Sequence, residues 1–553
     1  MNEYIVTCRS HEELVDLYDD METPGGNLYI PDRAVDLVHR RAISRNTHYM
    51  LTEEEAEQVR NDPRVIACER PAKDRGIVPT PFWTQTNDFN KTTGTFAGDD
   101  KNWGLYRVIE GDTVANWGSD NTAEITNRTI VTTASAKNVD VVIVDGHINP
   151  DHPEFAVNPD GSGGSRVNQF NWFQYNSVLG YGSNGTYTYS TSGASPNDNH
   201  GTHVAGTCCG NTQGWARDAN IYNMAFSDGL SGVSDWDEKL WDYLRHFHKN
   251  KAVNSATGRR NPTVTNHSWG YSYVDINLSS ITSVTYRGTT TAVSGTDAQR
   301  KTTLEANGVP VPAGTYLYKT PARVAAVDAD IQDAINDGVI VISSAGNSYW
   351  NCDVSGGNDY NNSINAGGTL YHSRGSTPGS ADNVICVGSI GSKVAEYKSN
   401  FSNWGERVDI WGPGSDIISS VYDSSSAATE GGYTPLVQDS RNSSYYLASI
   451  SGTSMSSPQV CGVIACLAEQ EPYLTQAEAL QHLKENALSE IGTTGTINQS
   501  TYEAFGDGPN RYLFMPKKRP TSGTLSPAFL HKNRNSDTDG IKYPRVRSNR
   551  VFK

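Results

Sequence analysis

The sequence predicts an α/β protein with a largely parallel β-sheet, preceded by a small α+β domain. The apolar, β-branched runs at 139–145 (VDVVIVD) and 339–347 (VIVISSAGN) each end in polar residues, as buried strands of a parallel sheet do where they meet a site. The small domain is predicted by its order of elements, because a strand, a helix, a strand, a helix and a strand follow one another within roughly 70 residues.

Local patterns predict each element of this small domain. Residues 4–8 (YIVTC) and 65–68 have strand character, and the apolar residues of 12–21 fall on one helical face. The sequence TEEE at 52–55 is a capping box, which predicts a helix running to about residue 60. We therefore expect a ferredoxin-like α+β domain over residues 1–72.

Three stretches of the larger domain carry candidate chemistry. At 451–462 (SGTSMSSPQVCG), Ser454 lies at a turn into an apolar helix, where a backbone N–H at the helix N-terminus favours developing negative charge. The alternative is a Ser/Thr-rich N-cap that only starts a helix. At 198–207 (DNHGTHVAGT), His200 stands at the start of a buried helix, and Asp145 ends the first apolar strand.

Together these stretches resemble the subtilase (subtilisin-like, S8) family of serine endopeptidases, in which the catalytic residues follow in the order Asp, His, Ser. The resemblance implies a subtilisin-like, doubly wound, mostly parallel sheet. It also implies a triad of Asp145, His200 and Ser454, with Asn347 donating to the oxyanion beside the Ser454 N–H. An alanine at position 347 would then cost roughly 100-fold to 1000-fold in turnover.

The same resemblance identifies the substrate groove. The sequence NHSWG at 266–270 is similar to the strand that pairs with extended substrate and walls the primary pocket, so Ser268, Trp269 and Gly270 are expected to line the groove. Protein or peptide substrates would add a strand there by β-augmentation, and the indole of Trp269 would favour apolar contacts.

The aspartate motif departs from the family pattern. Gly146 and His147 stand where Ser or Thr and then Gly are usual, and the missing hydroxyl predicts weaker support for the pair of Asp145 and His200. We still assign Asp145 rather than Asp151, because Asp145 ends the apolar strand.

The resemblance also predicts the domain organisation. Residues 49–71 are similar to the end of the inhibitor-like (I9-type) propeptide of subtilases, so we expect residues 1–72 to be a propeptide, an ordinary accessory domain being the alternative. Residues 73–100 would be a linker or processing region, in which self-cleavage is a hypothesis. Residues 101–515 would be the peptidase domain, closer to proteinase K-like members.

Two further segments are additions to that domain. Residues 271–320 predict a β-rich insertion of one or two hairpins, which rims the cleft, contacts another protein or only decorates the surface. Residues 516–553 carry ten basic and two acidic residues. Such a tail should be flexible, either simply solvated or docked on an acidic surface or nucleic acid.

Charge and hydropathy exclude several classes of protein. A net charge of −16 and a pI near 5.3 argue against nucleic-acid binding by the whole chain. No apolar run is long enough to span a bilayer, and the N-terminus lacks the pattern of a signal peptide. We expect no membrane partner and a cytoplasmic or virion-associated protein.

No cofactor is required by the expected chemistry. No HExxH pattern surrounds His200 and His203, so zinc is not expected there. The short connection after the histidine helix lacks the family's calcium loop, although Glu154 matches one of its ligands. A weak calcium site in 351–365 is the remaining candidate, and a solvated loop is the alternative.

The eight cysteines show no spacing typical of a disulfide framework. A bridge between Cys352 and Cys386 is the one candidate. Cys461 and Cys466 fall on the serine helix, where thiols pack as small apolar groups.

The predicted function is therefore peptide-bond hydrolysis through an acyl-enzyme, with self-processing of the propeptide. The alternative is a subtilase domain with a structural or maturation role in a larger assembly such as a phage virion. The insertion, the basic tail and the sequence PNRYLF at 509–514, which is similar to phage-encoded subtilases, motivate that alternative. A cytosolic bacterial housekeeping protease is a third hypothesis.

Overall fold

The structure is a computed structural model that describes residues 1–30, 37–40, 43–75, 77–81, 96, 98–111, 132, 134–189, 196–273, 275–392, 396–422, 436–492 and 508–515. The basic tail and most of the expected linker lie outside the described residues. Within the described part of the chain, no helix has the length and apolar character needed to cross a membrane.

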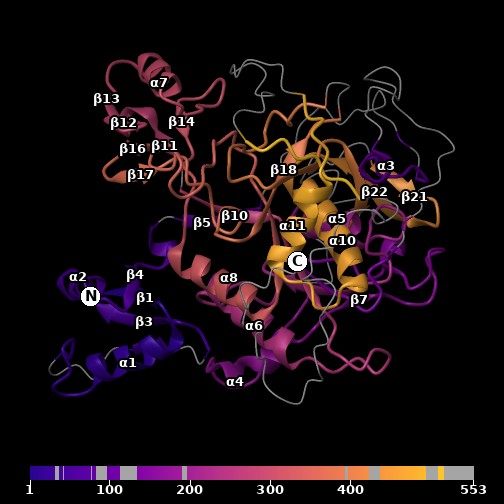
Figure 1. The fold of residues 1–553 in the computed structure, drawn as a ribbon, viewed down its shortest axis with the longest axis horizontal. Coiled ribbons are helices and arrows are strands. Elements are labelled where there is room, and N and C mark those ends of the chain that lie inside the picture. Colours follow the sequence, from indigo (N-terminus) through magenta and orange to yellow (C-terminus); the bar gives the residue numbers. More distant parts are fainter. Residues whose placement is uncertain are drawn as a thin grey trace, which may run out of the picture.

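A seven-stranded sheet forms the centre of the molecule (Figure 1), in the order β19-β18-β15-β9-β6-β8-β7. Every neighbouring pair in it is parallel. The strands are β6 (Asp140–Asp145), β7 (Val167–Asn168), β8 (Asn220–Ala225), β9 (Thr263–His267), β15 (Ile340–Ser344), β18 (Ile385–Ile390) and β19 (Ile410–Pro413). The two strands expected from the apolar runs, β6 and β15, are confirmed.

Helices cover both faces of this sheet. Alternate side chains of a strand point to opposite faces, and those of β6 are apolar on both, so each face needs a cover. Val141 and Ile143 of β6 share an apolar core with α5 and α10, whereas Val142 and Val144 share a second core with α6 and α8. The doubly wound α/β fold is therefore confirmed. The helices of this domain are α3 (Trp103–Glu110), α4 (Asn176–Leu179), α5 (Pro196–Cys209), α6 (Trp236–Asn250), α8 (Ala325–Asp337), α10 (Thr453–Gln470) and α11 (Gln476–Asn486).

The N-terminal domain is a four-stranded antiparallel sheet in the order β2-β3-β1-β4, packed against two helices. Its elements are β1 (Asn2–Cys8), α1 (His11–Glu22), β2 (Leu37–Arg40), β3 (Asn46–Leu51), α2 (Glu53–Arg60) and β4 (Val65–Glu69). Both bonds of the capping box between Thr52 and Glu55 are present. The helices and strands expected for residues 1–72 are confirmed.

This domain docks on α6 and α8 of the larger domain. The amide of Asn46 donates to Asp330 and to the carbonyl of Ala326, both at 3.1 Å, and the hydroxyl of Ser44 donates to Asp330 at 2.8 Å. In return, the N–H of Ala326 at the start of α8 donates to Glu69 at 3.3 Å. Beyond β4, η1 (Ala72–Arg75) leads to β5 (Ile77–Pro81), which pairs antiparallel with β10 (Trp269–Tyr273).

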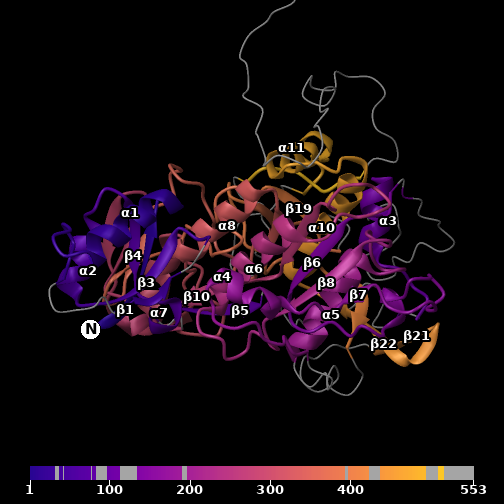
Figure 2. The same cartoon turned by 90° about the horizontal axis from the view of Figure 1, so that it is seen from below.

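The insertion is larger than the sequence predicted and folds around its own apolar core. Its elements are β11 (Ile276–Asn277), η5 (Leu278–Ser280), β12 (Ser283–Tyr286), β13 (Thr289–Ala292), α7 (Asp297–Ala306), β14 (Leu317–Tyr318), β16 (Ser363–Asn365) and β17 (Thr369–Tyr371). The hairpin of β12 and β13 was expected. β16 and β17, which follow β15 in the chain, join the same sheet. Helix α7 was not predicted. The insertion and the N-terminal domain lie at the same end of the molecule in both views (Figures 1 and 2).

A three-stranded sheet that the sequence did not predict packs beside α5. It consists of β20 (Ile417–Val421), β21 (Leu436–Asp439) and β22 (Asn442–Ile450), in the order β20-β22-β21. Ser419 and Ser420 of β20 donate their hydroxyls to the carbonyls of His203 and Thr202 on α5, at 2.9 and 3.0 Å. Gly206 permits this approach, since a Cβ there would lie 2.3 Å from both serine hydroxyls.

Candidate active site

Asp145 and His200 form a buried pair at the carboxyl end of β6. Oδ1 of Asp145 lies 2.7 Å from Nδ1 of His200, and both side chains are fully buried. The N–H of Gly146 donates to the same oxygen at 2.7 Å, while Oδ2 is buried and accepts no hydrogen bond from the described residues. Gly146 therefore supports the carboxylate only through its main chain, and only at one oxygen.

His147, the other departure from the family pattern, ties this loop to neighbouring elements. Its Nδ1 lies 2.7 Å from Asp228, and its N–H donates to Asp198 at the start of α5 at 3.1 Å. Its ring contacts Tyr189 and Tyr422, with centroids 5.7 and 5.4 Å away. The sequence suggested only the loss of a hydroxyl here, and the structure adds a connection between the loop and α5.

Ser454 lies in the first turn of α10, in a buried position. Its hydroxyl donates to the carbonyl of Ser268 at 3.3 Å, and the hydroxyl of Ser268 donates to the carbonyl of Ser454 at 3.0 Å. Ser268 in turn accepts from Asn266 at 3.0 Å, so β9 and the start of α10 are joined directly.

A glycine allows the serine helix to lie close to the histidine helix. A Cβ at Gly462 of α10 would lie 2.8 Å from the carbonyl of Cys208 on α5 and 2.6 Å from the side chain of Trp215. Both contacts are too short for any residue with a side chain. Gly462, the last residue of the sequence SGTSMSSPQVCG, is therefore required by the packing of α10 against α5.

Asn347 follows β15 and faces the start of α10. Its Oδ1 accepts hydrogen bonds from the N–H and the hydroxyl of Thr453, at 2.9 and 2.8 Å. The Thr453 hydroxyl also accepts from the N–H of Gly346 at 3.1 Å. These bonds fix which end of the amide faces Thr453, and they leave Nδ2 buried without an acceptor in the described part of the chain. A buried, unused donor is what stabilisation of an oxyanion requires.

Thr453, which orients the amide of Asn347, is a residue that the sequence analysis did not single out. The signal was present, since the residue directly precedes Ser454 in the motif that was singled out. Its role could not be inferred because the partner, Asn347, lies 106 positions away in the chain.

Two of the residues expected to line the groove, Trp269 and Gly270, border it through their main chains. Trp269 and Gly270 of β10 pair through their main chains with Pro81 and Thr80 of β5. The indole of Trp269 is fully buried in an aromatic core and contacts Trp236 at 5.9 Å between centroids. At this position the main chain, rather than the indole, borders the bound strand.

Glu154, which matched a calcium ligand, holds an arginine instead. Its buried carboxylate accepts from the N–H and hydroxyl of Thr212, at 3.0 and 2.6 Å, and pairs with Arg441, which also pairs with the buried Asp439. Burial alone raises the pKa of the Glu154 carboxyl, but Arg441 and Thr212 outweigh burial, so that this pKa lies below its ordinary value.

The other side chains considered as metal ligands also have internal partners. In the segment 351–365, Asp359 forms two bonds with the guanidinium of Arg287, at 2.8 and 3.0 Å, and Asp353 accepts from the N–H of Asp359 at 2.8 Å. Nε2 of His203 lies 3.0 Å from the carbonyl of Ile417, and burial lowers the pKa of His203 to about 3.

All eight cysteines, including Cys352 and Cys386, are thiols.

Comparison with known proteins gives one family and several relatives. Residues 136–513 match the family described as "Subtilase family". Subtilisin-like protease 3 of Arthroderma benhamiae is 37% identical over 145 residues, which cover 26% of this chain and 30% of that protein. The subtilisin-like serine protease Cla h 9.0101 of Davidiella tassiana is 24% identical over 443 residues, covering 78% of this chain and 62% of that protein. The chain thus spans less than two thirds of either relative.

Solved structures give more distant similarities. Fervidolysin from Fervidobacterium pennivorans, a keratinolytic enzyme related to subtilisin, is 16% identical with a TM-score of 0.47, covering 91% of this chain and 59% of that one. A cold adapted subtilisin-like serine proteinase is 21% identical with a TM-score of 0.42, covering 74% of this chain and 97% of that one.

Proposed function

Because this chain belongs to the subtilase family, we propose that it is a serine endopeptidase that hydrolyses peptide bonds through an acyl-enzyme. The observation that carries the proposal is the buried 2.7 Å bond between Asp145 and His200, beside the helix that presents Ser454. His200 would take the proton of Ser454 during attack and return it to the leaving amine. Asp145 would keep the proton of the neutral imidazole on Nδ1 and stabilise the imidazolium.

Asn347 would stabilise the tetrahedral intermediate. Its buried Nδ2 is held in place by the two bonds that Thr453 makes to Oδ1, and the N–H of Ser454 lies at the N-terminus of α10. Donors fixed before the reaction act on the charge that develops in the transition state, and they need no reorganisation when it forms.

Replacing Asn347 with alanine should lower kcat by about 100-fold to 1000-fold while KM changes little, because the donor acts on the transition state and not on bound substrate. Steady-state kinetics on a chromogenic peptide would measure both constants. Thr453→Val is the matched variant: it removes the hydroxyl that orients Oδ1 and keeps the N–H, so its kcat should fall by less. A rise in KM with little change in kcat in Asn347→Ala would point to a role in substrate binding instead.

We further propose that the N-terminal domain is a propeptide that the peptidase domain cuts off. The strand that follows this domain in the chain, β5, lies antiparallel along β10, so that Ile77 opposes Tyr273 and Pro81 opposes Trp269. The next residue of the peptidase strand is Ser268, whose carbonyl accepts the hydroxyl of Ser454. A chain that continues past Pro81 is therefore directed toward the nucleophile, as a substrate bound by β-augmentation would be.

This register predicts where processing occurs. Intact-mass measurement and N-terminal sequencing of the active protein should find a new N-terminus within about four residues after Pro81, since an extended chain covers only about 3.4 Å per residue. A catalytically competent preparation that keeps residues 1–81 covalently attached would contradict self-processing but would leave the proposed peptidase activity intact.

The rival proposal is a structural or maturation role in a larger assembly such as a phage virion, with proteolysis secondary. The insertion supports it, because Leu278, Val284 and Leu304 build a separate core that adds no residue to the proposed triad. In that case the wild type and Ser454→Ala should both stay full length and be inert toward a denatured protein. The insertion and the basic tail, 516–553, would then be the segments to test for a protein partner.

A further inference from the structure

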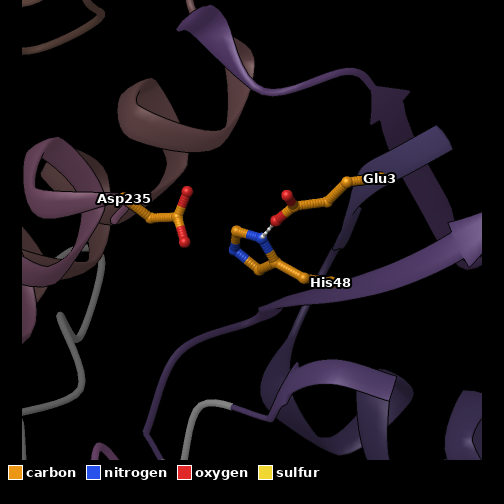
Figure 3. A group of neighbouring side chains, drawn as sticks. All are labelled: Glu3, His48 and Asp235. Atoms are coloured by element: carbon orange, nitrogen blue, oxygen red, sulfur yellow. Dashed lines mark hydrogen bonds and ion pairs between the residues drawn. The ribbon is translucent and has the colours of Figure 1, made fainter. Parts of the chain in front are cut away.

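A second cluster of chemically competent side chains lies between the N-terminal domain and α6, outside the proposed triad. It consists of Glu3 on β1, His48 on β3 and Asp235, the residue before α6. One potential ligand atom of each residue lies within 4.8 Å of the other two. Figure 3 shows the imidazole of His48 between the two carboxylates, which come from opposite sides of the junction. The His48 side chain is fully buried.

We propose that Glu3, His48 and Asp235 bind a divalent cation of the zinc type. Nδ1 of His48 lies 2.9 Å from Oε1 of Glu3. Two ligands that are each about 2.1 Å from one zinc ion lie about 3.0 to 3.5 Å apart, so this pair needs little movement to share an ion. Imidazole nitrogen together with carboxylate oxygen is a donor set that suits zinc and similar first-row metals.

The second nitrogen of His48 supports the same assignment. Nε2 lies 3.0 Å from Oε2 of Glu238, which is in the first turn of α6. Histidines that bind metals usually donate their other N–H to a carboxylate, which fixes the tautomer and the ring orientation. Glu238 would therefore hold the proton on Nε2 and leave the lone pair of Nδ1 for the cation.

Three carboxylates, those of Glu3, Asp235 and Glu238, lie near the imidazole of His48, and the side chain of Glu238 is 4% exposed. Their negative charge favours a bound divalent cation. The ligands come from both domains, so a bound ion would stabilise the docked state of the N-terminal domain.

The test is metal binding by the full-length chain, which does not depend on peptidase activity. The Ser454→Ala chain, stripped with a chelator, should bind one equivalent of Zn²⁺ in calorimetric titration. It should also bind Co²⁺ with a visible absorption band, and its Tm should rise with either metal. Using this variant keeps the chain uncut, so failure here is distinguishable from failure of the proposed function.

Variants locate the site. His48→Ala and Asp235→Asn should each weaken Zn²⁺ binding by about 100-fold or more, and Glu238→Gln by about 10-fold to 100-fold. His246→Ala is the matched control, because this histidine is also on α6 but contacts Tyr175, with 4.5 Å between ring centroids. Its affinity should equal that of the parent chain.

Two results would overturn the proposal. The first is the absence of stoichiometric binding to a folded chain. The second is unchanged affinity in Asp235→Asn and His48→Ala, with circular dichroism showing that each is folded; if His48→Ala does not fold, Asp235→Asn decides. Either result would mean that the cluster is an ion pair only, in which protonated His48 donates to Glu3 and Glu238.

Discussion

Replacing Ser454 with alanine should abolish peptidase activity and leave the chain at full length. Removal of the nucleophile of subtilisin lowers kcat by about a million-fold, and the same loss is expected here because the proposed acyl-enzyme forms on the Ser454 hydroxyl. The variant should remain folded, since the lost hydroxyl makes one 3.3 Å bond to Ser268 while the bond from Ser268 to the Ser454 carbonyl persists. Intact mass, Tm and hydrolysis of a denatured protein would measure all three expectations.

Ser456→Ala is the matched control for this experiment. Its hydroxyl is also buried on α10 but has no hydrogen-bond partner among the described residues. Activity and processing should therefore match the wild type. If Ser454→Ala retained more than a trace of activity, or was processed at the same position in the absence of other proteases, the proposed acyl-enzyme mechanism would be wrong.

Replacing Arg107 with methionine should destabilise the peptidase domain by about 3 to 5 kcal/mol, because it leaves a buried carboxylate without its partner. The guanidinium of Arg107 is fully buried and bonds both oxygens of Glu396, at 2.7 and 2.9 Å. It also bonds Glu490 at 2.8 Å and stacks on the ring of Tyr512 at 4.1 Å. The Arg107 side chain thus connects α3 with three distant residues, Glu396, Glu490 and Tyr512.

Two further variants separate charge burial from simple loss of a contact. Glu490 is 41% exposed, so Glu490→Gln should cost less than about 1 kcal/mol. The double variant Arg107→Met with Glu396→Gln should recover much of the loss, since a neutral amide is far cheaper to bury than a charge. Urea and thermal unfolding of these variants in the Ser454→Ala background would measure the differences. Equal losses for Arg107→Met and Glu490→Gln would contradict this account.

Elements that carry a local signal were predicted well. The β-branched run that became β6 is buried on both faces, and this burial is what removes polar residues from its sequence. The capping box at 52–55 likewise specifies α2 through contacts within the helix. The candidate triad came from motif resemblance, and the structure places Asp145 beside His200 at hydrogen-bond distance.

Elements that depend on distant partners were not predicted. The pairing of β12 with β16 joins segments about 80 positions apart, so neither segment shows that it belongs to one sheet. The sequence also predicted that Trp269 favours apolar contacts with substrate, whereas its indole is buried in the core. Strand alternation does not say which face the rest of the fold covers. Arg441, which pairs with the buried Glu154, is 287 positions from it.

By itself, the sequence determined the parallel α/β class and the α+β domain before it, because both depend on patterns within single strands, helices and turns. The candidates for catalysis came from the resemblance of its motifs to those of a known family. Only the tertiary structure decided that Thr453 orients Asn347, that β5 lies along β10, and that Glu3 and His48 meet Asp235. These juxtapositions depend on strand order and domain docking. Strand order and domain docking both depend on many weak packing contacts between segments that are distant in the chain. No single stretch of sequence specifies all of these contacts.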